Sequence, residues 1–304
     1  MLVVQERVQA ALDAGQPVVA LESTIFSTLG LPVPHNAEAL RRCAAAVEEG
    51  GAVPAVTAVL DGRWRVGLDD DEVARVLRGT RKVAERDLAV AAAQAWDVGV
   101  TTVSASVALA ARAGIEVFAT GGIGGVHRGA ETSFDVSADL EELARTPVAV
   151  VCAGAKSILD IGKTLEVLET KGVPVLGYRT EHFPAFWARS SGYRVDRRYD
   201  APDAVAAVID TQFALGMGGV LIANPIPEAD AIDANEMAHW ISAALKDAEH
   251  DGITGNRATP YLLKRIFELT GGRSLAANIA LVENNAAVAA DIAVALSARR
   301  RRKP

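Results

Sequence analysis

Residues 148–170, VAVVCAGAKSILDIGKTLEVLET, carry the clearest structural signal in the chain. The segment begins with an apolar run, VAVVC, passes through a short glycine-containing stretch, and continues as a helical pattern from Ser157 to Thr170. A short apolar run rich in β-branched residues is typical of a buried strand, and the second pattern is typical of an amphipathic helix. The segment therefore predicts a strand followed by a helix, which is the unit that α/β proteins repeat.

The same alternation extends in both directions from this segment. Strands are predicted at Pro17 to Ser23, Val53 to Leu60, Val117 to Ala119, Val148 to Cys152, Val173 to Tyr178 and Gly219 to Ala223. Helices are predicted at Asn36 to Glu48, Asp87 to Trp96, Ser157 to Thr170, Ala201 to Leu215, Asn235 to Ala248 and Ser274 to Ser297. Asp61-Gly62 is typical of a hairpin turn. We therefore expect α/β/α layers around a mainly parallel central sheet.

The domain organisation follows from the absence of any internal division in the sequence. No linker rich in proline, glycine or serine separates two halves, and no repeat is present. We expect one domain over residues 1–298. The run SARRRRKP at the C-terminus predicts a basic, disordered tail over residues 299–304.

Composition limits the class of protein. The chain has 304 residues, of which 50% are hydrophobic and 23% charged, and its formal net charge is −7. These values are typical of a globular protein with a sizeable core, and they exclude collagen, a disordered chain and a disulfide-stapled mini-protein. The negative charge argues against nonspecific nucleic-acid binding, which requires lysine and arginine to neutralise phosphates.

Cysteine content and apolar runs bear on the compartment. Cys43 and Cys152 are the only cysteines, and they form no CxxC or Cys/His spacing for zinc. Polar residues from Gln5 onward interrupt the start too early for a signal peptide, and no apolar run is expected to span a membrane. The sequence therefore predicts a soluble, cytoplasmic protein.

Polar residues gather directly after four of the predicted strands. Ligands of open α/β sheets bind outside the carboxyl ends of the strands, so these positions are the candidates for a site. The four clusters are Glu22-Ser23-Thr24, Thr120 to Gly129, Gly154 to Ser157, and Asn224-Pro225.

The cluster at Ala119 to Gly129, ATGGIGGVHRG, contains five glycines. Such a loop can cradle a phosphate, because glycine allows close backbone approach and positive φ. A tight structural loop is the alternative, since glycine-rich loops are not specific. His127 within it could be a metal ligand, a substrate contact or a hydrogen-bonded loop histidine.

Two strand-end residues are candidates for catalysis. A buried lysine is costly as a cation, so Lys156 could supply a neutral amine that attacks a carbonyl-like carbon. Alternatively, it reaches solvent or binds phosphate as a cation. Glu22 could act as a general acid, or it could face solvent while Ser23 or Thr24 caps the next element.

Asp135 and Asp139, in SFDVSADLEEL, place two carboxylates four residues apart. Carboxylate oxygens suit Mg²⁺ or Mn²⁺. The alternative is that Ser137 or Asp139 caps a helix that begins before LEEL.

Taken together, these segments resemble the pseudouridine-5′-phosphate glycosidase family, also called the indigoidine-synthase-A-like family. The resemblance extends over nearly the whole chain and is carried by many segments in one order. They include VVALESTI (18–25), PHNAE (34–38), GAVPA (51–55), KVAERDL (82–88), FATGGIGGVHRGAETSFDVSADLEEL (118–143), VVCAGAKSILDIGKTLEVLET (150–170), PAFWARSS (184–191), ANPIPE (223–228) and SLAANIALVENNA (274–286).

The resemblance implies the reversible reaction of pseudouridine 5′-phosphate with water to give uracil and D-ribose 5-phosphate. It also implies Mn²⁺, one ion per subunit with Mg²⁺ or another divalent ion as an alternative, and a homotrimer. The resemblance assigns Glu22 as proton donor, Lys156 as covalent nucleophile and Asp135 as metal ligand. The substrate-binding residues that it implies are Lys82, Val103, Ser137, Ala138 and Asp139, with Asn278 and His127 as further polar residues of the site.

One segment departs from the family pattern. The family reads Ser-His-Gly after ESTI, whereas here Ser27 is followed by Thr28, Leu29 and Gly30. Recognition of the base is the step that such a change would affect. Two alternatives to a C-nucleotide glycosidase are a Schiff-base aldolase that uses the same lysine and a non-catalytic sugar-phosphate sensor.

Overall fold

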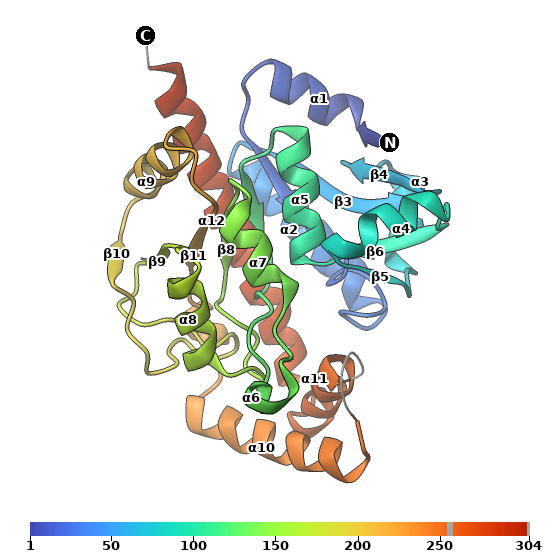
Figure 1. The fold of residues 1–304 in the computed structure, drawn as a ribbon, viewed down its shortest axis with the longest axis vertical. Helices are drawn as coiled ribbons and strands as arrows, with labels where there is room; N and C mark the ends of the chain where they lie inside the picture. Colours follow the sequence, from blue (N-terminus) through green and yellow to red (C-terminus); the bar gives the residue numbers. More distant parts are fainter. Residues whose placement is uncertain (254–257, 303–304) are drawn as a thin grey trace.

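A central sheet runs through the molecule with helices on both of its faces (Figure 1). This is a computed structural model, and it describes residues 1–253 and 258–302, without the side chains of 258–260. The strand order is β1-β4-β3-β2-β7-β8-β11-β9-β10, with β6 pairing β3 and β5 pairing β6. The strands are β1 (Leu2–Val4), β2 (Val18–Leu21), β3 (Val53–Leu60), β4 (Arg63–Val66), β5 (Lys82–Val83), β6 (Val98–Thr101), β7 (Val117–Ala119), β8 (Ala149–Cys152), β9 (Val175–Tyr178), β10 (Arg197–Tyr199) and β11 (Val220–Ala223).

Pairing is parallel along the whole path from β3 to β10. The antiparallel pairs are those of β4 and β6 with the second half of β3. All four residues of β2, β8 and β11 are buried, as expected for parallel strands covered on both faces. The mainly parallel sheet is confirmed.

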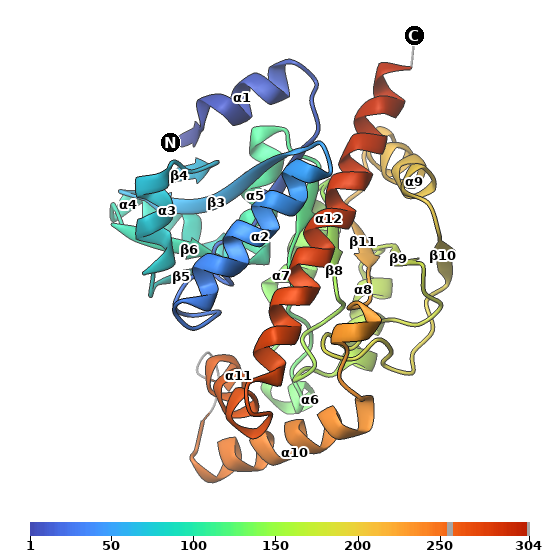
Figure 2. The same ribbon diagram turned by 180° about the vertical axis from the view of Figure 1, so that it is seen from behind.

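The helices form two outer layers. One face carries α5 (Val103–Ala113), α7 (Ala138–Arg145) and α8 (Ile161–Thr170), which lie in front in Figure 1. The opposite face carries α2 (His35–Glu49) and α12 (Arg273–Arg301), seen in Figure 2. These layers confirm the single α/β/α domain. The remaining helices are α1 (Glu6–Asp13), α3 (Asp70–Leu77), α4 (Leu88–Ala93), α6 (Ala130–Ser133), α9 (Pro202–Ala214), α10 (Ala234–His250), α11 (Ala258–Leu269) and the 3₁₀ turns η1 (Glu85–Asp87) and η2 (Glu228–Asp230).

The long helix α12 is the spine of the second layer. It packs against α2, α9 and strands β2, β7 and β8. By length and composition alone α12 could cross a membrane, contrary to the expectation from the apolar runs of the sequence. However, 67% of its most apolar window is buried inside the protein. Burial to this extent is typical of a core helix, so the length and apolar composition of α12 are weak evidence for a membrane span.

The basic run at the C-terminus continues α12 as far as Arg301. Arg299 Nε lies 2.9 Å from Asp210 Oδ2, and Arg300 pairs with Glu116. The expectation of a disordered tail from residue 299 is therefore wrong for 299–301, because acidic partners on α9 and beside β7 hold the last turn. Residues 303–304 lie outside the described part of the chain.

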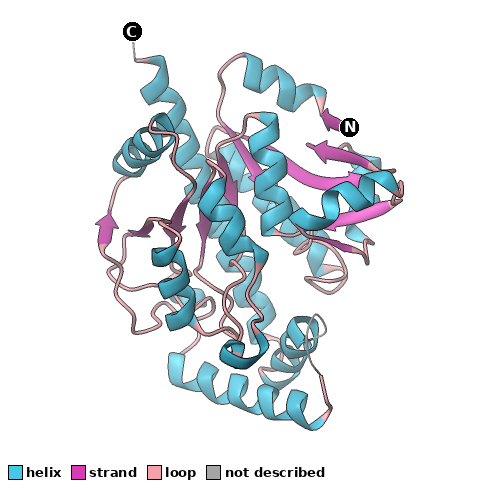
Figure 3. Ribbon diagram, in the orientation of Figure 1, coloured by secondary structure: helices cyan, strands magenta, loops and turns pink. Residues whose placement is uncertain are grey.

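Two helices extend beyond the sheet. Figure 3 shows α10 and α11 as a purely helical hairpin below the strands, and the two helices pack on each other. Another difference from expectation concerns α8, which begins at Ile161 rather than Ser157. The Asp160 side chain caps this helix by accepting a 3.0 Å hydrogen bond from the Lys163 N–H. Lys156 consequently lies in a turn.

Candidate active site

Polar side chains from neighbouring strands meet at one edge of the sheet. Glu22 follows β2, Thr120 follows β7, and Lys156 lies in the turn after β8. The chain leaves β2 toward β3 on one side and leaves β7 toward β8 on the other, so the β2–β7 boundary is a topological switch point. Crevices at switch points are where open α/β sheets bind ligands.

Glu22 is a buried carboxyl group. The residue is only 5% exposed, and its Oε1 accepts a hydrogen bond from the Thr120 hydroxyl. Burial raises the pKa of Glu22, while the charge of Lys156 and the Thr120 hydrogen bond act in the opposite direction. A carboxyl group in this environment keeps its proton to a higher pH than usual, as a general acid requires.

Lys156 is half-buried and its backbone is fixed. Its N–H donates to the Ile123 carbonyl at 3.1 Å, which ties the turn to the glycine-rich loop. Within residues 1–253 and 258–302, the side-chain amine has no hydrogen bond or ion pair. Its positive charge acts to lower the pKa of Glu22, so the amine lies within electrostatic range of that carboxyl group. The amine is therefore available to a ligand beside a protonatable carboxyl group.

Lys82 is the second lysine of this group. It is the first residue of β5, and solvent reaches its side chain. Desolvation of the Lys82 amine is the largest effect on its pKa and lowers it, and repulsion from Lys156 lowers it further. The negative charges of Asp139, Glu22 and Asp87 act in the opposite direction. Desolvation and Lys156 thus oppose the cationic form of Lys82, which a bound anion would favour.

Val103, predicted to contact substrate, is the buried first residue of α5. Strand β5 pairs with β6 directly before this helix, and the Thr102 N–H donates to Val83 at 2.9 Å. The pairing places the N-terminus of α5 next to the strand that carries Lys82. The Thr102 side chain does not cap the helix. A helix N-terminus beside a lysine is suited to a phosphate.

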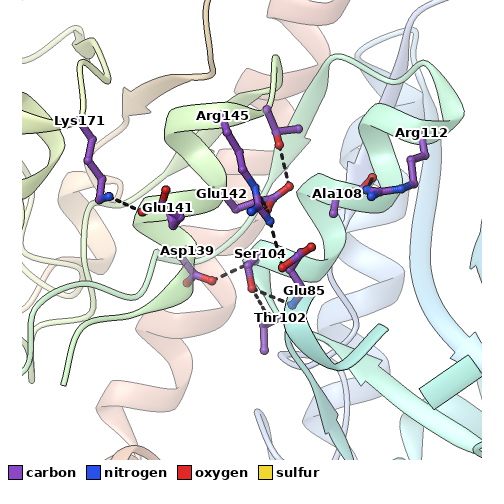
Figure 4. Close-up of polar contacts among 11 residues, drawn as sticks. Glu85, Thr102, Ser104, Ala108, Arg112, Asp139, Glu141, Glu142, Arg145 and Lys171 are labelled. Carbon is purple, nitrogen blue, oxygen red and sulfur yellow. Dashed lines mark hydrogen bonds and ion pairs between the residues drawn. The ribbon is translucent and has the colours of Figure 1, made fainter. Parts of the chain in front are cut away.

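Asp139 has a structural task that the sequence did not reveal. Its Oδ1 accepts from the Ser104 N–H at 2.9 Å and its Oδ2 from the Gly124 N–H at 2.8 Å, and Figure 4 shows its approach to Ser104. One carboxylate thus joins the first turn of α5 to the glycine-rich loop. Ser137 is the N-cap of α7, accepting from the Asp139 N–H at 3.2 Å, while Ala138 is exposed. The capping alternative is therefore correct for Ser137.

We expect Asp139→Ala to destabilise the protein. The substitution leaves the buried Ser104 N–H and the partly buried Gly124 N–H without acceptors, and a buried unsatisfied group costs about 1–3 kcal/mol. The free energy of unfolding, measured by urea titration, should fall by that order. Asp135→Asn, at a more exposed carboxylate of the same segment, is the control and should leave it unchanged. Equal stability of Asp139→Ala and the parent would contradict this role.

A second set of contacts holds α7 against the segment that follows Lys82. Arg145 lies between Glu142 and Glu85, 2.9 Å from Glu85 Oε2 (Figure 4). The Glu85 N–H donates to Ser104 Oγ at 3.3 Å. Helix α7, η1 and the first turn of α5 are therefore joined by polar contacts next to the candidate phosphate site.

Several glycines of the glycine-rich loop are packed closely against neighbouring residues. A Cβ on Gly124 would lie 2.2 Å from Ser137 Oγ, and one on Gly122 would lie 2.7 Å from the Phe186 ring. The N–H groups of Ile123, Gly124, Val126 and His127 all donate to protein acceptors. These contacts favour the tight-loop alternative for those four positions, because their N–H groups are not free to cradle a phosphate.

His127 and Asp135 form a separate pair beside this loop. His127 Nδ1 lies 3.8 Å from Asp135 Oδ2, and the His127 N–H donates to the Asp135 carbonyl at 3.0 Å. The described residues contain no group of three or more His, Cys, Asp or Glu side chains that could hold a metal ion. A Mg²⁺-like ion is commonly held by one or two carboxylates with the rest of its shell from water and substrate. Asp135 fits only that kind of site.

Asn278 lies on α12 and contacts the segment between β9 and β10. Its Oδ1 accepts from Trp187 Nε1 at 2.9 Å. Phe186 packs against Trp187 and lies beside Gly121 and Gly122. Asn278 is therefore attached to the same wall of the site as the glycine-rich loop, and in the described part of the chain its amide nitrogen has no hydrogen-bond partner.

The segment that departs from the family pattern forms a tight turn. The Thr28 hydroxyl donates to the Gly79 carbonyl at 2.8 Å, and the Gly30 N–H donates to Ser27 at 3.0 Å. A Cβ on Gly30 would lie 2.4 Å from backbone atoms of Ile25. Thr28 thus links this turn to the end of α3.

Three residues support Glu22 in a role that the sequence did not assign to them. Thr120, Asn285 and Asn224 are all buried and form a hydrogen-bonded series that ends on the carboxyl group. Thr120 and Asn224 had a signal, because each directly follows a predicted strand. Asn285 had no such signal, because Asn278, Glu283 and Asn284 are polar residues of the same helix.

Comparison with known proteins places this geometry in a family. The family model described as indigoidine synthase A like protein matches residues 7–295. A pseudouridine-5′-phosphate glycosidase of Sorangium cellulosum (strain So ce56) is 60% identical over 97% of this chain and 94% of its own length. One of Methylobacterium nodulans is 56% identical over 98% of this chain and 88% of its own length.

Solved structures agree. The prealnumycin C-glycosynthase AlnA in complex with ribulose 5-phosphate superposes with a TM-score of 0.92 at 38% identity, over 100% of this chain and 99% of that one. An indigoidine synthase A-like protein from Thermotoga maritima gives 0.88 at 35% identity, over 98% and 97% of the two chains.

Proposed function

The chain belongs to the indigoidine synthase A-like family of pseudouridine-5′-phosphate glycosidases, and we propose how its site cleaves a C-glycosidic bond. The reaction interconverts pseudouridine 5′-phosphate and water with uracil and ribose 5-phosphate. The observation that carries the mechanism is the amine of Lys156, which has no partner among the described side chains and acts electrostatically on the buried carboxyl group of Glu22.

The substrate poses a particular chemical problem. Its ribose is joined to uracil by a carbon–carbon bond, so protonating a leaving nitrogen or oxygen, as in most glycosidases, is impossible. In the first step, the lone pair of Lys156 Nζ attacks C1′ and the bond from C1′ to the ring oxygen breaks. Glu22 donates its proton to that oxygen, which becomes a hydroxyl group.

The second step breaks the carbon–carbon bond. The attack leaves a positive charge on the nitrogen, and the Glu22 carboxylate removes a proton from it, which restores the nitrogen lone pair. This lone pair forms a C1′=N bond while the electrons of the C1′–C5 bond pass to the uracil ring, which takes up the proton from Glu22. Water then adds to the imine and releases ribose 5-phosphate, and Lys156 returns to the free amine. Carboxylate and amine are both needed, and both are present on neighbouring strand ends.

The phosphate of the substrate is assigned to Lys82 and to the N-terminus of α5, beside the Ser104 N–H that Asp139 already occupies. The two lie side by side through the β5–β6 pairing. A phosphate dianion restores the positive charge that burial and Lys156 oppose on Lys82. The same anion leaves Lys156 as the lysine free to react at C1′.

We also propose that Asp135 holds a divalent ion, Mn²⁺ or Mg²⁺, with water and substrate completing its shell. Such an ion orders water and substrate oxygens when bound. Treatment with a chelator should abolish turnover, and Mn²⁺ should restore it. Asp135→Asn should raise the Mn²⁺ concentration needed for half-maximal activity, measured by metal titration. Full turnover by a thoroughly demetallated sample would remove the ion from the mechanism.

Incubation with uracil, ribose 5-phosphate and Mn²⁺ tests the activity directly. Formation of pseudouridine 5′-phosphate, identified by mass and chromatography, is the expected result. Activity with a different aldehyde and none with uracil would favour an aldolase, and binding without turnover would favour a sensor. A cytoplasmic homotrimer remains our proposal for location and assembly.

A further inference from the structure

We propose that Thr120, Asn285 and Asn224 are positioning residues that fix which oxygen of Glu22 carries the transferable proton. The inference rests on the proposed function, in which Glu22 is the proton donor. It concerns the side of Glu22 that contacts Thr120. The three residues come from the ends of β7 and β11 and from the middle of α12.

The Thr120 hydroxyl has one acceptor. Its hydrogen bond to Glu22 Oε1 is the only one that it makes within the described residues, and Thr120 is fully buried. If the Glu22 proton sat on Oε1, the Thr120 hydroxyl would have to turn away and leave its own proton without an acceptor. A buried unsatisfied donor is costly, so Thr120 donates and Oε1 remains the carbonyl-type oxygen.

The proton of Glu22 therefore belongs on Oε2. In the described part of the chain this oxygen has no hydrogen-bond partner, and it is not among the fully enclosed unpaired atoms. The charged groups that act on Glu22 are Lys156, Asp139 and Lys82. Oε2 is thus the oxygen left for the reacting atoms.

Asn285 holds Thr120 in place. Its Nδ2 donates to the Thr120 carbonyl at 2.8 Å, and its Oδ1 accepts from Asn224 Nδ2 at 2.9 Å. A carbonyl can only accept, so the amide orientation of Asn285 is determined at both ends. The Asn224 N–H is itself fixed on Cys152 at 2.8 Å. Ser274 and Asn285 are the only polar residues among the buried positions described for α12, and the Asn285 amide binds the backbone beside Glu22.

Removing the Thr120 hydroxyl tests the inference. Thr120→Val is nearly isosteric, and we expect kcat to fall by about 10- to 100-fold, the loss of a hydrogen bond to a chargeable group, with KM nearly unchanged. The Thr120 hydrogen bond lowers the pKa of Glu22, so the limb of the kcat–pH profile that reports Glu22 should move to higher pH. Thr120→Ser should restore both the rate and the profile. Asn285→Leu should reproduce the shift in part.

A substrate-free measurement separates this inference from the proposed function. The carboxyl C=O infrared band that disappears in Glu22→Gln reports protonation of Glu22 in the free protein, and in Thr120→Val it should persist to higher pH. A parent protein without C-nucleotide activity but with this band shift would overturn the function alone. A kcat and a band titration in Thr120→Val equal to those of the parent, or a loss not rescued by Thr120→Ser, would overturn the positioning role.

Discussion

Lys156→Ala should lose nearly all turnover and the ability to form a covalent adduct with ribose 5-phosphate. In the parent, the amine attacks the aldehyde carbon of the open-chain sugar, water leaves, and an imine forms. Borohydride reduces that imine to a stable amine. Mass spectrometry of the digested protein should therefore find the reduced sugar phosphate on the peptide that carries Lys156.

Two other lysines provide the controls. Lys163 is held by Glu131 at 2.7 Å and by Asp160 at 3.2 Å, so Lys163→Ala should keep both the adduct and the activity. Lys82→Ala should raise KM by weakening phosphate binding, yet Lys156 should still be labelled at saturating sugar phosphate. The fold should survive Lys156→Ala, because the side chain makes no hydrogen bond or ion pair within the described residues. Labelling at Lys82 instead of Lys156 would contradict the mechanism.

The fold was largely predictable because strands buried on both faces are short apolar runs. The six predicted strands all occur, with ends shifted by a residue or two. Helix α5 was missed because eight of its residues, Val103 to Ala110, are buried, so it lacks a polar face that would show a helical period. Strands β1, β5 and β10 are only two or three residues long, and such pairing depends on neighbours far along the chain.

The residues of the candidate site were also predictable only in part. Glu22 and Lys156 were identifiable because each follows a buried strand, and the resemblance gave them roles. Asp139 was expected to bind substrate, yet both of its oxygens accept backbone N–H groups from segments 15 and 35 residues away. No local pattern reveals such partners. Asn285 shows the same limit, since its partner Thr120 is 165 residues distant.

The second large effect concerns Glu22→Gln. The substitution keeps size and shape, and its carbonyl oxygen can still accept from Thr120, but it cannot transfer a proton. Turnover should fall by about 10²–10⁴-fold, the usual contribution of a general acid or base, while ribose 5-phosphate still binds. Single-turnover kinetics and a ligand titration measure the two quantities separately. A rate equal to that of the parent would assign Glu22 to structure alone.

Stability should change in the opposite direction to activity. Burial raises the pKa of Glu22, so the folded protein binds its proton more tightly than the unfolded chain does. Between the ordinary pKa of a glutamate and the raised one, the folded state carries more protons, and the free energy of unfolding falls as pH rises. Glu22→Gln lacks this loss. Relative to the parent, its free energy of unfolding should therefore rise with pH across that window and stay level above it.

Urea titrations of both proteins at several pH values measure the difference, and Thr120→Ser, which keeps the carboxyl group and its hydroxyl donor, should follow the parent. A difference that is independent of pH would mean that Glu22 has no raised pKa in the fold, and the carboxyl group would then lose the property that suits it to donate a proton at neutral pH.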